Sequence, residues 1–352
     1  MIWLATMGMD VPMENDHKTI NEIECRWSVV IPAYNADGRI IPLLEALKHQ
    51  NIPRDDYEII VVDDGSNDGT AEAVKAFSDV KLIQQQNRGP AAARNLGARS
   101  ASGDVILFTD SDCIPTSNWI SQMVAPFSNP QVVGVKGVYQ TEQSSLIARF
   151  IQAEYQDKYR KMAKQKSIDF IDTYSAAYRR EMFLKYQGFD ENFPVPSAED
   201  VEFSFRLAEA GHLMVFNSKA VVNHVFEDTW WGYFWKKFKN GFWRLMAIKR
   251  HPNKILRDSH TPQVQKLQIA LVLGGLLCAL MSAVSVVFWW GILGAFLAHQ
   301  ISSLPFQYRL LHQDRGLFPV SFILLPIRSL SLCLGLISGI VALSTRWRKH
   351  SA

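Results

Sequence analysis

The stretch from Val105 to Asp112 constrains the fold more than any other part of the chain. It opens as the continuous apolar run Val-Ile-Leu-Phe, which is typical of a strand buried in a parallel sheet. It ends in Asp110-Ser-Asp112, so two carboxylates leave the carboxyl end of that strand. Mg²⁺ and Mn²⁺ prefer such oxygen ligands together with substrate phosphates. An Asp-rich turn would contain the same residues, and the neighbouring segments decide between the two.

Strand-like and helix-like segments alternate before this stretch. Apolar strands are expected over residues 27–35, 57–62 and 81–84, and helices over residues 39–50, 70–77 and 91–100. This alternation predicts a doubly wound, mainly parallel α/β sheet. Ligands of such sheets bind outside the carboxyl ends of the strands. Tyr34, Asp64 and the Asp110/Asp112 pair all fall at such ends, so we expect one site at this edge.

Four motifs, in order along the chain, resemble those of family 2 glycosyltransferases with the GT-A fold. They are Val30-Ile-Pro-Ala-Tyr-Asn35, Val61-Val-Asp-Asp-Gly-Ser66, Asn87-Arg-Gly-Pro-Ala-Ala-Ala-Arg-Asn95 and Asp110-Ser-Asp112. The resemblance covers roughly residues 27–245. It implies a Rossmann-like GT-A sheet and an enzyme that inverts the anomeric carbon of a nucleotide-diphosphate sugar.

The resemblance also assigns the donor site. It implies that Pro32, Tyr34 and Asp64 hold the nucleotide base and ribose, while Asp110 and Asp112 hold Mg²⁺ or Mn²⁺ and the sugar diphosphate. Asp64 has an independent reason, because a carboxylate can accept a hydrogen bond from a base N–H.

Three further residues have two possible roles each. Arg94 faces the same edge and either contacts the donor or forms a structural ion pair. The acidic pair Glu199-Asp200 precedes a helical pattern. By resemblance Asp200 is the catalytic base, and the alternative is that the pair only complements a helix N-terminus. His224 follows an apolar strand; it completes the metal site in many family members, or is structural.

Two differences from the motifs of related subfamilies narrow the range of reactions expected of this chain. Asp110-Ser-Asp112 is followed by Cys113 and lacks the nearby Gln that dolichol-phosphate sugar synthases often have, which weakens a polyprenyl-phosphate sugar synthase as the alternative. The Gln-x-x-Arg-Trp motif of processive synthases is absent. Transfer of one sugar is therefore favoured over polymerisation.

The second half of the sequence points to a membrane. Between Lys236 and Lys266 there are nine Lys or Arg residues against one Asp, and long apolar stretches follow, so the basic run suggests a membrane surface and not a nucleic acid. Aromatic residues at helical spacing from Trp231 to Phe242 predict an interfacial helix, with packing on the sheet as the alternative. A second such helix, over residues 144–166, has a core or acceptor-cleft alternative.

The apolar stretches predict transmembrane helices. Residues 267–305 contain no Asp, Glu, Lys or Arg and fit two helices that meet near Trp289. A further segment, 317–343, is expected to be broken by Pro326 and Arg328. Two to four spans are compatible with this pattern. The four separated cysteines form no disulfide or zinc pattern, which fits a catalytic domain facing the cytosol.

The expected protein is thus a multi-pass enzyme of the cell membrane. It would pass one sugar to a hydroxyl of a membrane-held acceptor, such as a lipid-linked glycan. A sugar-nucleotidyltransferase and an inactive membrane scaffold are the less favoured alternatives. The expected regions are a leader (1–26), the GT-A domain (27–245), a basic linker (246–266), transmembrane helices (267–344) and a basic tail (345–352).

Overall fold

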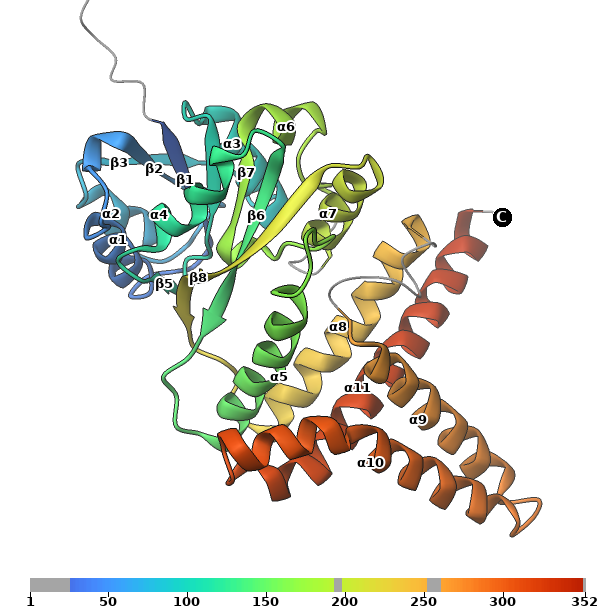
Figure 1. The fold of residues 1–352 in the computed structure, drawn as a ribbon. Coiled ribbons are helices and arrows are strands. Elements are labelled where there is room, and N and C mark those ends of the chain that lie inside the picture. Colours follow the sequence, from blue (N-terminus) through green and yellow to red (C-terminus); the bar gives the residue numbers. More distant parts are fainter. Residues whose placement is uncertain (1–25, 193–197, 252–260, 351–352) are drawn as a thin grey trace, which may run out of the picture.

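The computed structural model describes residues 26–192, 198–251 and 261–350. Almost all of the predicted leader lies outside these residues, as does part of the predicted linker. The described chain forms a sheet-based lobe and a group of long C-terminal helices beside it (Figure 1).

One mixed sheet of eight strands organises the lobe, in the order β3-β2-β1-β4-β7-β6-β8-β5. The first four strands run parallel to their neighbours, and β7 then pairs antiparallel with β4. The strands are β1 (Trp27–Ala33), β2 (Tyr57–Asp63), β3 (Val80–Gln84), β4 (Val105–Phe108), β5 (Cys113–Pro115), β6 (Val132–Gln140), β7 (Ala176–Arg179) and β8 (Leu213–His224).

Helices cover both faces of this sheet. Helices α1, α2, α4 and α5 contribute to one apolar core, while α3, α6 and α7 contribute to the other. Their bounds are α1 (Ile40–Lys48), α2 (Thr70–Lys75), α3 (Pro90–Ser100), α4 (Trp119–Val124), α5 (Leu146–Met162), α6 (Arg180–Lys185) and α7 (Glu199–Glu209), with short 3₁₀ turns at Arg54–Asp56, Ala125–Ser128 and Thr173–Ser175. The doubly wound, mainly parallel sheet predicted from the sequence is confirmed.

The C-terminal helices are joined to the lobe by a shared core. They are α8 (Trp230–Arg250), α9 (Gln263–Met281), α10 (Phe288–Gln313) and α11 (Leu317–His350). Leu310 of α10 and Leu324 of α11 belong to the same buried cluster as Phe150 of α5. Helix α5 thus lies between the sheet and the C-terminal helices (Figure 1), which is the packing alternative expected for that segment.

Helix α11 is continuous, so the break predicted at Pro326 and Arg328 is wrong. Proline lacks an N–H and leaves the carbonyl four residues earlier without its helical partner. That carbonyl belongs to Phe322, and it accepts a hydrogen bond from the Gln300 side chain of α10 at 3.1 Å. The charge of Arg328 does not break the helix, because its side chain pairs with Glu154 of α5 at 2.9 Å.

Two helices of the described residues are long and apolar enough to cross a membrane: α9 and the Leu317–Ala342 part of α11. Helix α9 exposes apolar side chains such as Leu267, Leu277 and Leu280, which are 51%, 56% and 75% exposed. The break before α10 covers residues 282–287, slightly earlier than Trp289. The two ends of the predicted linker (246–266) are helical, since α8 continues to Arg250 and α9 begins at Gln263.

Helices α8 and α11 approach closely where glycines face the partner backbone. A Cβ atom on Gly335 would lie 2.2 Å from the Phe238 carbonyl oxygen, and one on Gly241 would lie 2.4 Å from that of Leu332. Small residues four apart, as Gly335 and Gly339 are, allow such close packing of helices. Helix α8 is therefore held against α11, and its aromatic side chains Trp231 and Trp235 remain exposed.

We expect Gly335→Ala to destabilise the chain by about 1–3 kcal/mol, the usual cost of overpacking, because the methyl group would push α8 away from α11. The measurement is thermal denaturation of the full chain in detergent. Gly274→Ala in α9 is the matched control, since a Cβ there meets nothing within 4 Å. Equal melting temperatures for the two variants would contradict the close approach.

Candidate active site

The carboxyl ends of β1, β2 and β4 meet at one edge of the sheet, where Tyr34, Asp64 and Asp110 follow them. These side chains surround a cavity of about 530 Å³, here called the donor cavity. Its lining contains every residue predicted for the donor and the metal: Pro32, Tyr34, Asp64, Arg94, Asp110, Asp112 and His224. The structure therefore brings together residues that are almost 200 positions apart in the sequence.

Asp64 fixes the loop that leads into α3. Its carboxylate accepts hydrogen bonds from the Arg88 N–H at 2.8 Å, the Gly89 N–H at 2.8 Å and the Gln85 side chain at 2.7 Å. Gly89 has φ +89°, a conformation that glycine adopts without a steric penalty. A carboxylate can accept about four hydrogen bonds. Asp64 therefore shapes the cavity wall and can still accept one further hydrogen bond.

The pairing of β5 with β8 places His224 beside Asp112. Cys113 at the start of β5 is directly opposite His224 at the end of β8, and His224 Nε2 lies 3.5 Å from Asp112 Oδ2. Burial acts to raise the pKa of Asp112, but the hydrogen bond and charge of His224 outweigh it and lower that pKa. Asp112 is therefore ionised at neutral pH, as a metal ligand must be.

The side-chain atoms at this edge that could ligate a metal fit a hard divalent cation. Asp110, Asp112 and Cys113 each offer one ligand atom within 4.8 Å of the others. Burial raises the pKa of the Cys113 thiol well above its usual range, and a protonated thiol is a poor metal ligand. Two carboxylates with a nearby imidazole remain, and such a set suits Mn²⁺ or Mg²⁺ better than a soft metal.

Arg94 joins the donor cavity to α7. Its side chain is almost wholly buried, with Nη2 2.6 Å from Asp110 Oδ1 and Nη1 3.0 Å from Glu199 Oε1. Of the two roles considered for Arg94, the structure therefore contains the ion pair, although the residue also lines the donor cavity. Because Glu199 is the first residue of α7, one guanidinium positions both Asp110 and the helix that carries Asp200.

Asp200 lines a second cavity of about 230 Å³, here called the acceptor cavity. The two cavities share four lining residues: Arg94, Asp110, Tyr139 and Lys236. Burial, aided by the charge of Glu199, raises the pKa of Asp200 to about 7. The carboxylate is thus poised near neutral pH, the range in which a general base works best.

Sequence reasoning missed the residues that β6 and the 3₁₀ turn at Thr173–Ser175 add to this region. Lys136 is buried in an apolar strand, donates to the Tyr174 hydroxyl at 3.0 Å and pairs with Asp172. Burial lowers the pKa of Lys136 well below its usual range. Tyr174 and Asp172 line the acceptor cavity. The lone lysine in the run Val-Val-Gly-Val-Lys136-Gly-Val was the one available signal.

Carboxylates at the carboxyl edge of a parallel sheet, with a further acid in an adjoining cavity, characterise enzymes that handle phosphorylated ligands with a metal ion. The model of the family described as Glycosyl transferase family 2 matches residues 28–187. The region 28–187 of the chain therefore forms a glycosyltransferase domain of this family.

Curated relatives agree with this assignment. Glycosyltransferase AglE of Haloferax volcanii is 32% identical over 207 residues, covering 56% of this chain and 66% of that protein. The O-antigen chain rhamnosyltransferase RfbN of Salmonella typhimurium is 29% identical over 211 residues, covering 56% and 65%. The chain thus matches somewhat less than two thirds of the length of either relative.

A solved structure has the same fold. The mannosyltransferase PcManGT from Pyrobaculum calidifontis, solved in complex with GDP-Man and Mn²⁺, superposes with a TM-score of 0.60 at 19% identity, covering 90% of this chain and 87% of that one. At this identity the likeness establishes the GT-A fold, and the superposition extends into the C-terminal helices.

Proposed function

We propose that this chain is a membrane-anchored, metal-dependent, inverting glycosyltransferase. It moves one sugar from a nucleotide-diphosphate sugar to a hydroxyl group of a lipid-linked glycan or another membrane-held acceptor. The observation that carries this proposal is that the donor cavity and the acceptor cavity meet at a junction. Asp110 lines both cavities, and Asp200 lines the acceptor cavity. A donor in the first cavity and an acceptor in the second would meet at this junction.

The donor cavity supplies the binding half of the proposal. Pro32, Tyr34 and Asp64 would hold the base and ribose, and Asp110, Asp112 and His224 would hold Mg²⁺ or Mn²⁺ with the diphosphate. When bound, such an ion would supply positive charge against the negative charge of the leaving nucleotide. The ion pair with Arg94 fixes the Asp110 carboxylate, so its orientation toward the donor is set before the donor binds.

Asp200 supplies the chemical half. In its ionised form it accepts the proton of the acceptor hydroxyl while that oxygen attacks the anomeric carbon opposite the nucleotide. One such displacement inverts the configuration at that carbon. The second carboxylate, Glu199, is occupied with Arg94, which leaves Asp200 as the proton acceptor.

The C-terminal helices supply the anchor. Apolar side chains project from α9 into solvent. Exposed apolar surface of this kind marks a protein or membrane interaction site, and the length and hydropathy of α9 favour the membrane. We propose that α9 and α11 enter the membrane, with the catalytic region (27–245) in the cytosol and α8 at the interface. Since α11 packs along α8, we expect the anchor and the catalytic region to form one unit instead of two separable domains.

Product analysis tests the reaction. The full chain is incubated with Mn²⁺, a panel of nucleotide sugars and membrane lipids carrying glycan acceptors. Release of nucleoside diphosphate with a glycosylated lipid supports the transferase. Release of pyrophosphate would indicate a sugar-nucleotidyltransferase, a glycosylated bare lipid phosphate would indicate a polyprenyl-phosphate sugar synthase, and absence of turnover would indicate a scaffold.

We expect Asp112→Asn to abolish metal-dependent nucleotide binding, because it removes a charged ligand that faces the donor cavity. His224→Ala should raise the Mn²⁺ concentration needed by about 10 to 100-fold. The measurement is the thermal shift caused by the nucleotide at increasing Mn²⁺. Asp104→Asn, an exposed carboxylate away from the cavity, is the control. Unchanged Mn²⁺ dependence in the His224 variant would make that histidine structural.

A further inference from the structure

A third cavity, of about 270 Å³, lies between α5, α8, α9 and α11, and is here called the junction cavity. It shares five lining residues with the acceptor cavity: Glu154, Lys158, Lys237, Asn240 and Arg244. The three cavities therefore form a series that begins at the metal site, passes Asp200 and ends among the helices proposed to enter the membrane. A ligand in the junction cavity could extend toward Asp200.

The lining of the junction cavity is strongly positive. Five of its residues are Lys or Arg, against the two acids Glu154 and Asp157. Both acids are already matched by cations. Glu154 pairs with Lys237 at 2.7 Å and Arg328 at 2.9 Å, and Asp157 pairs with Arg309, which is not part of the lining, at 2.5 Å. The net charge of the cavity favours an anionic ligand.

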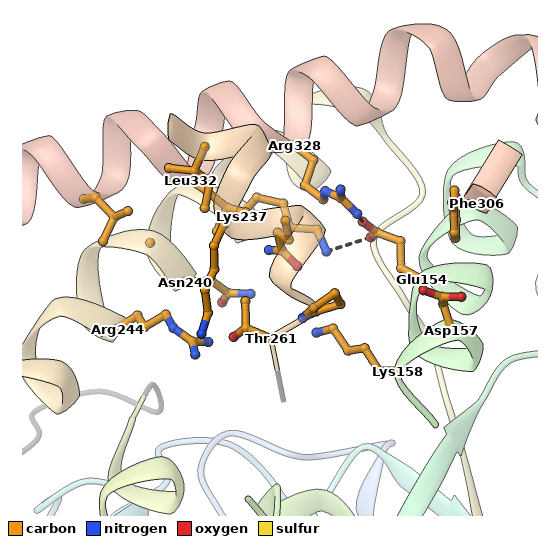
Figure 2. Close-up of a pocket in the computed structure, with 16 residues that line it drawn as sticks. Glu154, Asp157, Lys158, Lys237, Asn240, Arg244, Thr261, Phe306, Arg328 and Leu332 are labelled. Carbon is orange, nitrogen blue, oxygen red and sulfur yellow. Dashed lines mark hydrogen bonds and ion pairs between the residues drawn. The ribbon is translucent and has the colours of Figure 1, made fainter. Parts of the chain in front are cut away.

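The cations reach the cavity from different helices. Lys158 of α5 and Arg244 of α8 extend toward each other across it, and Arg328 enters from α11 (Figure 2). Lys266 adds a cation from the first turn of α9. Burial, together with repulsion by Lys237, lowers the pKa of Lys158 to about 7. Bringing several cations together is costly, and a bound anion would remove that cost.

Another part of the lining is apolar. Ile269 comes from α9, Leu332 and Leu336 come from α11, and Phe306 comes from α10. Among the helices in the described part of the chain, α9 and α11 are the two that are long and apolar enough to span a membrane. The cavity thus presents cations beside hydrocarbon walls that continue along these two helices. A ligand with a charged group attached to a hydrocarbon chain matches both parts.

We propose that the junction cavity binds the phosphate or diphosphate group of the lipid acceptor, with the lipid chain along α9 and α11 and the attached sugar in the acceptor cavity. This inference rests on the proposed transferase function and names its acceptor: a lipid-phosphate-linked sugar whose hydroxyl is glycosylated.

Two observations favour a sugar hydroxyl over the lipid phosphate as the nucleophile. The acceptor cavity separates the junction cavity from the donor edge, which leaves space for a sugar between the phosphate and Asp110. A phosphate monoester has a second pKa near 6 and is already ionised at neutral pH, so it needs no base. A hydroxyl does need one, and Asp200 lines the intervening cavity.

The test uses the full chain in phosphatidylcholine nanodiscs. Binding of a long-chain polyprenyl diphosphate is titrated and compared with inorganic pyrophosphate and with the uncharged polyprenol. We expect the polyprenyl diphosphate to bind tightest, because it alone supplies both charge and chain. Equal affinity for pyrophosphate would show that the lipid chain adds nothing and that the site binds free phosphates. Equal affinity for the polyprenol would show that the diphosphate group is not recognised, which would overturn the proposal.

The variant is Arg244→Gln combined with Lys266→Gln, which removes two cations of the lining. Each lost ionic contact should weaken binding about tenfold, so the Kd for polyprenyl diphosphate should rise roughly 100-fold. The matched control, Lys164→Gln with Lys166→Gln, removes two exposed cations outside the lining and should leave that Kd unchanged. Equal affinities for the two double variants would overturn the proposal.

A second readout separates this inference from the proposed function. Nucleotide binding with Mn²⁺, followed by thermal shift, reports on the donor cavity and also on the folding of each variant. If the wild type binds no nucleotide but binds the lipid more tightly than the Arg244→Gln, Lys266→Gln variant does, the transferase function fails and the lipid site stands. If nucleotide binding persists while lipid affinity is the same in wild type and cavity variant, the lipid site alone fails.

Discussion

Replacing Asp200 by Asn is expected to reduce the rate of sugar transfer by about 10² to 10⁴-fold, the usual contribution of a positioned general base. The amide keeps the shape of the carboxylate and cannot accept the hydroxyl proton. Nucleotide affinity should stay near that of the wild type, because Asp200 is not among the residues that line the donor cavity. Initial rates at saturating donor, with nucleotide binding measured in parallel, test both parts.

Two companion results complete this prediction. Glu199→Gln should cost less than Asp200→Asn, since Glu199 contacts Arg94 and is proposed to position other groups. The wild-type product should have the anomeric configuration opposite to that of the donor. An Asp200 variant within a few-fold of wild type, or a product that retains configuration, would rule out this mechanism.

The raised pKa of Asp200 has a consequence that does not depend on activity. A carboxyl whose folded pKa is about 7, against an ordinary value of 3.8, ionises more readily in the unfolded chain. The contribution of Asp200 to the free energy of unfolding therefore falls as pH rises from about 4 to 7. Asn cannot ionise, so the Asp200→Asn variant should melt increasingly above the wild type across that range. Melting curves that stay parallel would show that Asp200 is not held in a desolvated position.

Local patterns explain which features could be predicted from the sequence. The strand that ends before Asp110 and the helix that begins at Glu199 are marked by apolar runs and spacing within a few residues, and both lie where expected. The gathering of Tyr34, Asp64 and Asp110 at one edge of the sheet could be inferred because parallel strands place their carboxyl ends together. The contact of Arg94 with Glu199 joins residues 105 positions apart, and no local pattern encodes it.

The C-terminal region shows the same limit. Hydropathy identifies α9 and α11 as apolar, but it does not reveal that Arg328 is neutralised by Glu154 of a distant helix. The break predicted at Pro326 was wrong for a related reason, since the partner of the released Phe322 carbonyl comes from α10. Tertiary contacts decide such positions, and they are outside the reach of periodicity.

Replacing Arg94 by Met is expected to lower the free energy of unfolding by about 3–5 kcal/mol, the usual cost of removing one partner from a buried ion pair. Arg94 is almost wholly buried between Asp110 and Glu199, so its loss leaves two carboxylates without their cation. Both should relax away from their present positions. Nucleotide binding and transfer should then fall together, because Asp110 lines the donor cavity and Glu199 begins the helix of Asp200.

Arg88→Met is the matched control for this change. Arg88 also pairs with a glutamate, Glu191, at 2.8 Å, but its side chain is 62% exposed, and exposed pairs contribute about 0–1 kcal/mol. Arg94→Lys should fall between the two, since one ammonium cannot reproduce the two-pronged contact of a guanidinium. Chemical denaturation of the full chain in detergent measures all three. If the Arg94 and Arg88 variants lose equal stability, Arg94 does not join the donor edge to α7, and the coupling between metal site and base must be sought in other contacts.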